Sequence, residues 1–201
     1  MHIISNNMEL NNSKVSYNTN LPEKKDHGLD FNHMILHDFN IEAQNLNVDS
    51  GKIHLDLNNL SFEEKSGMKV FDLQSRIRLN KQKLSIKDLA MRTPYSFFQT
   101  DSIVLLHDHY KNFSDPLNKL KLDIALRESN IAFNDLAYFS STFQDIPNQN
   151  FVISGNINGT VSNLKGDSVF VGTGRQSELL TDFSLTGLPD ISKTYMYIEV
   201  N

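Results

Sequence analysis

A chain of 201 residues, 39% of them apolar, is long enough to bury the core of one domain of ordinary size. Its 19 basic and 24 acidic residues leave a net charge of -5, which argues against a nucleic-acid partner and against a polybasic membrane surface. The absence of cysteine excludes disulfides, thiolate metal sites and cysteine nucleophiles.

The N-terminal part, residues 1–30, carries the weakest pattern, and residues 21–28 have the composition of a polar loop. The first residues lack the basic start, apolar run and cleavage site of a signal peptide. No stretch reaches the roughly 18 apolar residues of a membrane-spanning helix. We therefore interpret residues 1–201 as a single β-rich segment of a larger protein.

The dominant signal is an alternation of apolar and polar residues with period two, seen most clearly at residues 119–126. This pattern predicts a mainly β fold, an antiparallel sheet of repeated hairpins with one apolar face and one polar face that is exposed to solvent. The candidate residues of the apolar face are Ile53, Leu55, Leu57, Leu84, Ile86, Leu122, Ile124, Leu126, Phe151, Ile153, Ile157, Val161, Phe183 and Leu185.

Turn residues separate these strands at a spacing typical of an all-β protein. The predicted hairpin turns are 49–51, 66–67, 80–83 and 163–167, and residues 107–118 are predicted to form a longer, flexible loop. Apolar residues at three- and four-residue spacing from Leu136 predict one short helix near 135–144, with Asn134 and Asp135 at its N-cap.

Two glycines, Gly155 and Gly159, fall within a predicted strand, where they are expected if the sheet bends or if a neighbour approaches closely. We favour bending, because a curved sheet with an apolar concave face is a groove. The 13 Phe residues leave two alternatives open, since they can line a lipid-binding face or fill a sandwich core. Alternation alone favours the core.

No catalytic constellation is found. His107 and His109 have chelating spacing, but no third histidine follows at a spacing that would complete a zinc site, and Gly172-Thr173-Gly174 lacks the remainder of a phosphate-binding motif. The pair Glu63–Glu64 is expected to be exposed, and His33 and His37 are expected at the surface. The sequence therefore predicts a protein that is not an enzyme and binds no metal or cofactor.

Several stretches in a fixed order resemble the TamB and AsmA-like proteins of diderm bacteria, in particular the long Bacteroidetes-type homologues. The likeness covers roughly residues 40–201, as an internal or N-terminal-region fragment of such a protein. The stretches are SFEEKSGMKVFDLQSRI (61–77), KLSIKDLAMRTPYSFFQTDSIVL (83–105), FNDLAYF (133–139), VISGNINGTVSNLKGDSVFVGTG (152–174) and FSLTGLPDISKTYMYIEV (183–200).

The resemblance implies an extended, taco-like β-groove that is anchored in the inner membrane and spans the periplasm. Its apolar lining is expected to bind phospholipid acyl chains and to move phospholipid between the inner and outer membranes. A second function of the family is translocation and assembly in outer-membrane biogenesis and protein secretion. There, a C-terminal region that this chain lacks is expected to contact an outer-membrane barrel protein.

Three functions thus remain open from the sequence: a lipid-conducting groove, a protein-binding scaffold with a free strand edge, and a carbohydrate-binding or enzymatic β-sandwich. The third is the weakest, because the chain has no Trp to serve as a sugar platform.

Overall fold

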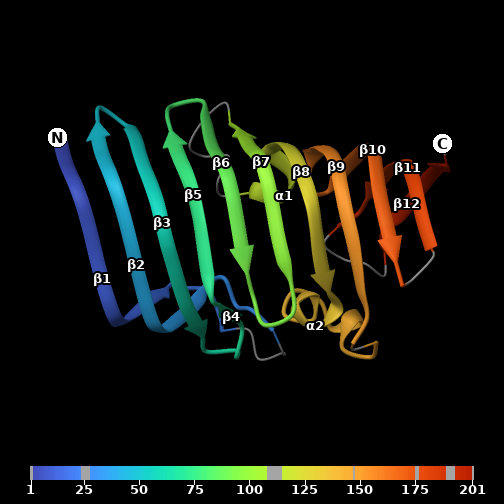
Figure 1. The fold of residues 1–201 in the computed structure, drawn as a ribbon, viewed down its shortest axis with the longest axis horizontal. Helices are drawn as coiled ribbons and strands as arrows, with labels where there is room; N and C mark the ends of the chain where they lie inside the picture. The colour runs from blue at the N-terminus through green and yellow to red at the C-terminus, as the bar shows by residue number, and fades with distance from the viewer. Residues whose placement is uncertain are drawn as a thin grey trace.

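The computed structural model describes residues 2–23, 28–107, 115–146, 148–174, 177–188 and 193–200. Within these ranges the chain forms twelve strands and three short helical turns (Figure 1). The strands are β1 (His2–Asn18), β2 (His33–Asp49), β3 (Lys52–Glu64), β4 (Lys69–Val70), β5 (Asp72–Leu79), β6 (Lys83–Arg92), β7 (Phe97–Leu106), β8 (Lys121–Ala132), β9 (Asn150–Thr160), β10 (Asn163–Thr173), β11 (Ser177–Thr186) and β12 (Tyr195–Val200). The helical turns are α1 (Pro116–Lys119), α2 (Phe133–Leu136) and η2 (Ser141–Phe143).

All twelve strands belong to one antiparallel sheet, in which neighbours along the chain are neighbours in space. The order is β1-β2-β3-β5-β6-β7-β8-β9-β10-β11-β12, and the short β4 pairs with the end of β3. Since β1 and β12 do not pair, the sheet is open, and Figure 1 shows it curling toward its C-terminal edge. The predicted mainly β, antiparallel, groove-like fold is confirmed, and no second sheet covers it within the described ranges.

The sheet bends at β-bulges, where one strand carries an extra residue and the local twist increases. Residues with positive φ mark several of them, including Asn45 in β2, Asp88 in β6 and Ser168 in β10. The amide of Ser168 donates to Asp182 on the neighbouring strand at 2.7 Å, which fixes the extra residue in place.

The strand glycines lie where β9 comes close to β10, and Gly155 also lies opposite the bulge at Ser168. Gly155 and Gly159 have φ of 130° and 117°, a region that side chains rarely adopt. A Cβ at Gly155 lies only 2.8 Å from the carbonyl oxygen of Ser168, and a Cβ at Gly159 meets the carbonyl oxygen of Asn163. These glycines therefore allow the close approach of β10, and at Gly155 this approach coincides with a bulge that bends the sheet, so both explanations from the sequence apply there.

Two boundaries differ from the sequence predictions. Residues 163–167 are the start of β10 rather than a turn, because the β9–β10 hairpin turns within two residues, Val161 and Ser162. The predicted helix is two separate turns: α2 begins at Phe133, and its N-cap Ala132 makes no side-chain cap hydrogen bond. The turn at residues 66–67 is found as predicted, as are those at 49–51 and 80–83.

A cluster of buried hydrophobic residues lies at one end of the sheet, shown at the bottom of Figure 1 around β4 and α2. We call this region the cap, and it consists of residues 28–32, β4 with its preceding turn, and residues 133–139. Its cluster contains Leu29, Met68, Val70, Phe62, Leu73, Met91 and Tyr138. Residues far apart in the sequence close it: the amide of Leu29 donates to the carbonyl of Tyr138 at 2.9 Å.

Candidate functional site

One face of the sheet carries a continuous row of aliphatic side chains that crosses all eleven strands of the main path. Residues directly opposite one another on neighbouring strands lie on the same face, so the strand registers define the row. It runs Ile3, Val48, Ile53, Leu79, Leu84, Leu105, Leu122, Gly159, Leu164, Leu185 and Met196. Every member is aliphatic except for one glycine, and we call this the first row.

A second row lies beside the first on the same face, from β3 to β12. It runs Leu55, Ile77, Ile86, Ile103, Ile124, Ile157, Gly166, Phe183 and Ile198. At about 4.8 Å between strands, the first row extends roughly 48 Å along the sheet. Together the two rows form an apolar strip perpendicular to the strands, and we call the face that carries them the apolar face.

The side chains of the two rows are only partly shielded from solvent. Within the sheet they are half-buried, and at the ends Ile3 is 40%, Met196 58% and Ile198 46% exposed. In a sandwich the second sheet would bury such residues almost completely. Here each side chain is shielded by its neighbours along the row, while its outer surface faces solvent. The apolar face is therefore an open strip, and the predicted sandwich core is not found within the described residues.

The fourteen candidate lining residues fall into three groups. Nine lie in the two rows, namely Ile53, Leu55, Leu84, Ile86, Leu122, Ile124, Ile157, Phe183 and Leu185. Leu57 and Leu126, which are buried, and Phe151 and Ile153 lie on the same strands nearer the cap end. Val161 is in the β9–β10 turn and outside the strip.

Several members of the strip, such as Ile77 and Ile103, were not among the candidate lining residues, although both stand in alternating stretches. A search for alternation in every strand would have found them. Only the registers show that they join the other residues in one line.

The opposite face is polar and carries ion pairs. Arg76 on β5 donates to the carboxylate of Asp88 on β6 through Nε at 2.8 Å, and Arg127 on β8 lies 3.7 Å from the same carboxylate. The hydrogen bond from Arg76 is the main cause that lowers the pKa of Asp88. Likewise the amide of Asn45 donates to Asp56 at 2.8 Å and lowers the pKa of that carboxyl. These charged side chains are solvated, and they make this face of the sheet hydrophilic.

A buried polar cluster, missed by sequence reasoning, joins the cap to the sheet. Asp135, 7% exposed, accepts hydrogen bonds from Thr93 Oγ1 at 2.6 Å and from Ser96 Oγ at 2.5 Å. Ser96 Oγ also accepts from the backbone amide of Ala132 at 2.9 Å. Asp135, which was predicted as an N-cap residue, thus joins the β6–β7 turn to α2 through these hydrogen bonds, and we call this contact the clamp.

Three expectations about titratable residues need correction. Glu64 is 1% exposed, not solvated, and its carboxylate accepts from the amides of Ile35 at 3.2 Å and Ser66 at 2.7 Å. His33 is half-buried beside Asp30, 3.0 Å away, and His107 is buried at the end of β7 instead of lying in a solvated loop.

Part of the predicted 107–118 loop, residues 108–114 with His109, lies outside the described residues, while α1 occupies Pro116–Lys119. No group of three or more potential metal ligands is found in the described part of the chain. Over the same residues, no helix is long and apolar enough to cross a membrane.

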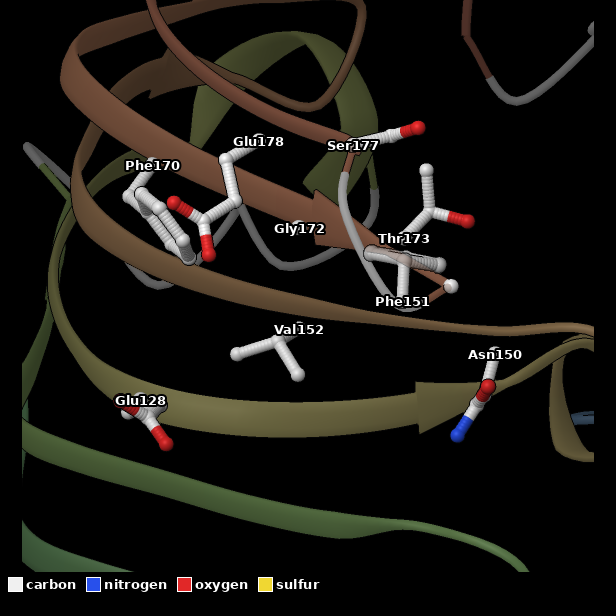
Figure 2. A pocket seen from close by; sticks show the side chains of 10 residues that line it. Glu128, Asn150, Phe151, Val152, Phe170, Gly172, Thr173, Ser177 and Glu178 are labelled. Carbon is white, nitrogen blue, oxygen red and sulfur yellow. The ribbon is translucent and has the colours of Figure 1, made fainter.

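A depression of about 490 Å³ opens between β8 and β11. Figure 2 shows Val152 at its centre, with Glu128 on one side and Glu178 beside the Phe170 ring on the other. Both glutamates are exposed. Acid–base chemistry favours a carboxyl that is shielded from solvent or coupled to another group, so this depression is a poor catalytic site.

Comparison with protein-family models, with curated proteins and with solved structures finds no match for this chain. The apolar face is therefore the structural feature from which a function can be inferred.

Proposed function

We propose that the apolar face binds the acyl chains of lipids and that the protein is a segment of a lipid-conducting β-groove without enzymatic activity. The observation that carries this proposal is the pair of aliphatic rows, which cross the sheet in register and are left open to solvent. Contiguous exposed apolar surface of this extent is rare in soluble proteins that bind nothing.

The chemistry of the strip suits an acyl chain better than a polar ligand. Each methylene that leaves water for such a surface contributes about 0.8 kcal/mol, and this contribution needs no directional contact. The rows contain no charged residue, so an acyl chain can lie anywhere along them without burying an unpaired charge. A ligand held by uniform contacts is free to slide, which is the property that conduction requires.

The resemblance to TamB and AsmA-like proteins supports the same proposal and extends it. It suggests phospholipid as the cargo, the periplasm as the location and an inner-membrane anchor elsewhere in the full-length protein. The ordered stretches 61–77, 83–105 and 133–139 carry this part of the proposal.

Binding of a fluorescent phospholipid by the purified chain tests the proposal, with a matched pair of variants. Ile103 belongs to the second row, whereas its neighbour Val104 in β7 faces the polar side. We expect the double variant Ile103→Gln/Ile124→Gln to lose at least about tenfold in affinity, the equivalent of about 1.4 kcal/mol. We expect Val104→Gln to bind as the unchanged chain does.

Native mass spectrometry of protein purified from phospholipid-containing cells should show bound lipid for the unchanged chain and for Val104→Gln. Equal loss of binding in the two kinds of variant, or no bound lipid in any of them, would contradict the proposal.

A further inference from the structure

The basic side chains of the sheet differ between the two ends of its strands. Near the cap they are balanced by carboxylates: the Nζ atom of Lys65 lies 2.6 Å from Glu23, and that of Lys69 lies 2.7 Å from Glu63. Arg92 is also in an ion pair, at 2.7 Å. Positive charge at the cap end is therefore already compensated within the chain.

The opposite end of the sheet, at the top of Figure 1, carries exposed cations that form no ion pair within the described residues. We call this end the turn edge, because it holds the turns at 49–51 and 80–83. The net charge of -5 describes the whole chain and hides this separation of charge. The exposed cations of the turn edge are Lys52, Arg78, Lys81, Lys83, Lys121 and Lys165.

A depression of about 470 Å³ at the turn edge brings two of these cations together with the first row. Lys52 and Arg78 line it, and so do Ile53 and Leu79, which are members of the first row on β3 and β5. One carboxylate, from Asp49, also lines it. The depression therefore combines an excess of positive charge with the margin of the apolar strip.

The same combination recurs further along the edge. A depression of about 580 Å³ is lined by Lys121 and Lys165, together with Leu122 and Gly159 of the first row. It too contains one carboxylate, from Asp123. Cations thus repeat along the turn edge beside the first row, in parallel with the strip.

The lysines at the start of two strands are placed to reach the margin of the apolar face. Lys52 and Lys83 are the first residues of β3 and β6, and each directly precedes a member of the first row, Ile53 or Leu84. Only a turn lies beyond either lysine. A lysine stem can lie along apolar surface while its ammonium group stays in water. These ammonium groups can therefore reach around the edge to an anion held beside the first row.

We propose that the turn edge binds the anionic headgroup of a phospholipid whose acyl chains lie on the apolar face, so that the groove selects anionic over zwitterionic lipids. This inference rests on the proposed function and names the class of lipid that the groove takes. Ammonium groups without an ion pair stabilise a nearby phosphate, whereas the cation of a zwitterionic headgroup is repelled by them. The cap end lacks this property, since its lysines are already paired.

Binding of two fluorescent phospholipids with identical acyl chains, a phosphatidylglycerol and a phosphatidylcholine, tests this selection. We expect the unchanged chain at low salt to bind the phosphatidylglycerol about fivefold more tightly. The preference should disappear at about 1 M salt, where the Debye length is about 3 Å. Affinity for the phosphatidylcholine should change little with salt.

A matched pair of triple variants locates the effect. Lys52→Gln/Lys81→Gln/Lys83→Gln removes three cations of the turn edge, and it should abolish the preference without changing the affinity for phosphatidylcholine. Lys65→Gln/Lys69→Gln/Arg92→Gln removes the same charge at the cap end, and it should keep the preference. Exposed ion pairs contribute little to stability, so this control should remain folded.

The outcomes separate this inference from the proposed function. Equal affinity of the unchanged chain for both lipids, or equal loss of the preference in the two triple variants, would overturn the selection and leave the groove in place. Binding of neither lipid would overturn both. Competition by glycerol phosphate at the concentration of the lipid would show a site for free phosphate and contradict the inference. Ile103→Gln/Ile124→Gln should weaken both lipids by the same factor, because these residues belong to the strip.

Discussion

The cap and the open strip lie on the same face of one sheet, yet they have opposite relations to solvent. In the cap, the loop residues Leu29 and Met68 are themselves only 6% and 9% exposed, and they pack against apolar side chains at the ends of the strands, such as Leu73. A few residues further along the same strands, Ile77 and Ile86 are covered by no other element of the described chain.

The difference shows how stability and binding are separated in this fold. The cap holds a cluster of buried apolar side chains and the hydrogen-bonded carboxylate of Asp135, so the cap is expected to supply much of the tertiary stability. The strip makes its contacts only along the rows, and its outer surface remains available to a ligand. Four variants or conditions test this division, from the largest expected effect to the smallest.

Removing the buried carboxylate of Asp135, which forms the clamp, should have the largest effect on the free energy of unfolding. Asp135→Ala deprives the hydroxyls of Thr93 and Ser96 of a buried acceptor, which should lower the free energy of unfolding by about 3 kcal/mol. Urea unfolding followed by circular dichroism measures the loss. The control Asp145→Ala, at an exposed position, should change it little. Equal effects of the two substitutions would place the stability outside the cap.

A side chain at the β9–β10 contact should cost somewhat less. Gly155→Ala requires a positive φ and a Cβ within 2.8 Å of the Ser168 carbonyl oxygen and of Val169 Cα. We expect a loss of about 2 kcal/mol in the free energy of unfolding. Gly174→Ala is the comparison, because a Cβ there has nothing within 4 Å. Unfolding curves that coincide for the two variants would show that β10 can move away freely.

Truncation within the strip should affect stability less and binding more. Leu84 is half-buried in the first row, so Leu84→Ala should lower the free energy of unfolding by only about 1 kcal/mol while weakening binding of a fluorescent phospholipid. Met68→Ala in the cap should show the reverse, a loss of about 2 kcal/mol with unchanged affinity of the folded protein. Parallel changes in both quantities would contradict the division.

The polar face should give the smallest effect, and a pH-dependent one. Arg76 lowers the pKa of Asp88 below its ordinary value of 3.8. A lowered folded-state pKa contributes stability above the unfolded pKa, and this contribution disappears as the pH falls through the folded value. Between about pH 6 and pH 3, the unchanged chain should therefore lose slightly more stability than Arg76→Gln. Thermal unfolding at both pH values measures the difference, and equal losses would mean that the pair contributes nothing.

The local pattern of the sequence determined the strands and most of the strip. Alternation identified nine members of the two rows, because a strand places every second side chain on one face whatever its neighbours are. The turns at 49–51, 66–67 and 80–83 were equally visible, since their Gly, Asn and Ser residues tolerate turn conformations. Val161 and residues 163–167 were misplaced, because a two-residue turn without glycine or proline carries no such signal.

Only the tertiary structure decided whether the apolar face is covered. Alternation shows that one face is apolar, but a sandwich core and an open strip have the same alternation. Contacts between distant residues decide which part of that face is buried. Leu29 meets Tyr138, and Asp135 meets Thr93, at separations that no local pattern encodes. The registers likewise depend on bulges such as the one at Asp88, where one extra residue shifts the pairing of β5 with β6 between the two rows and the cap.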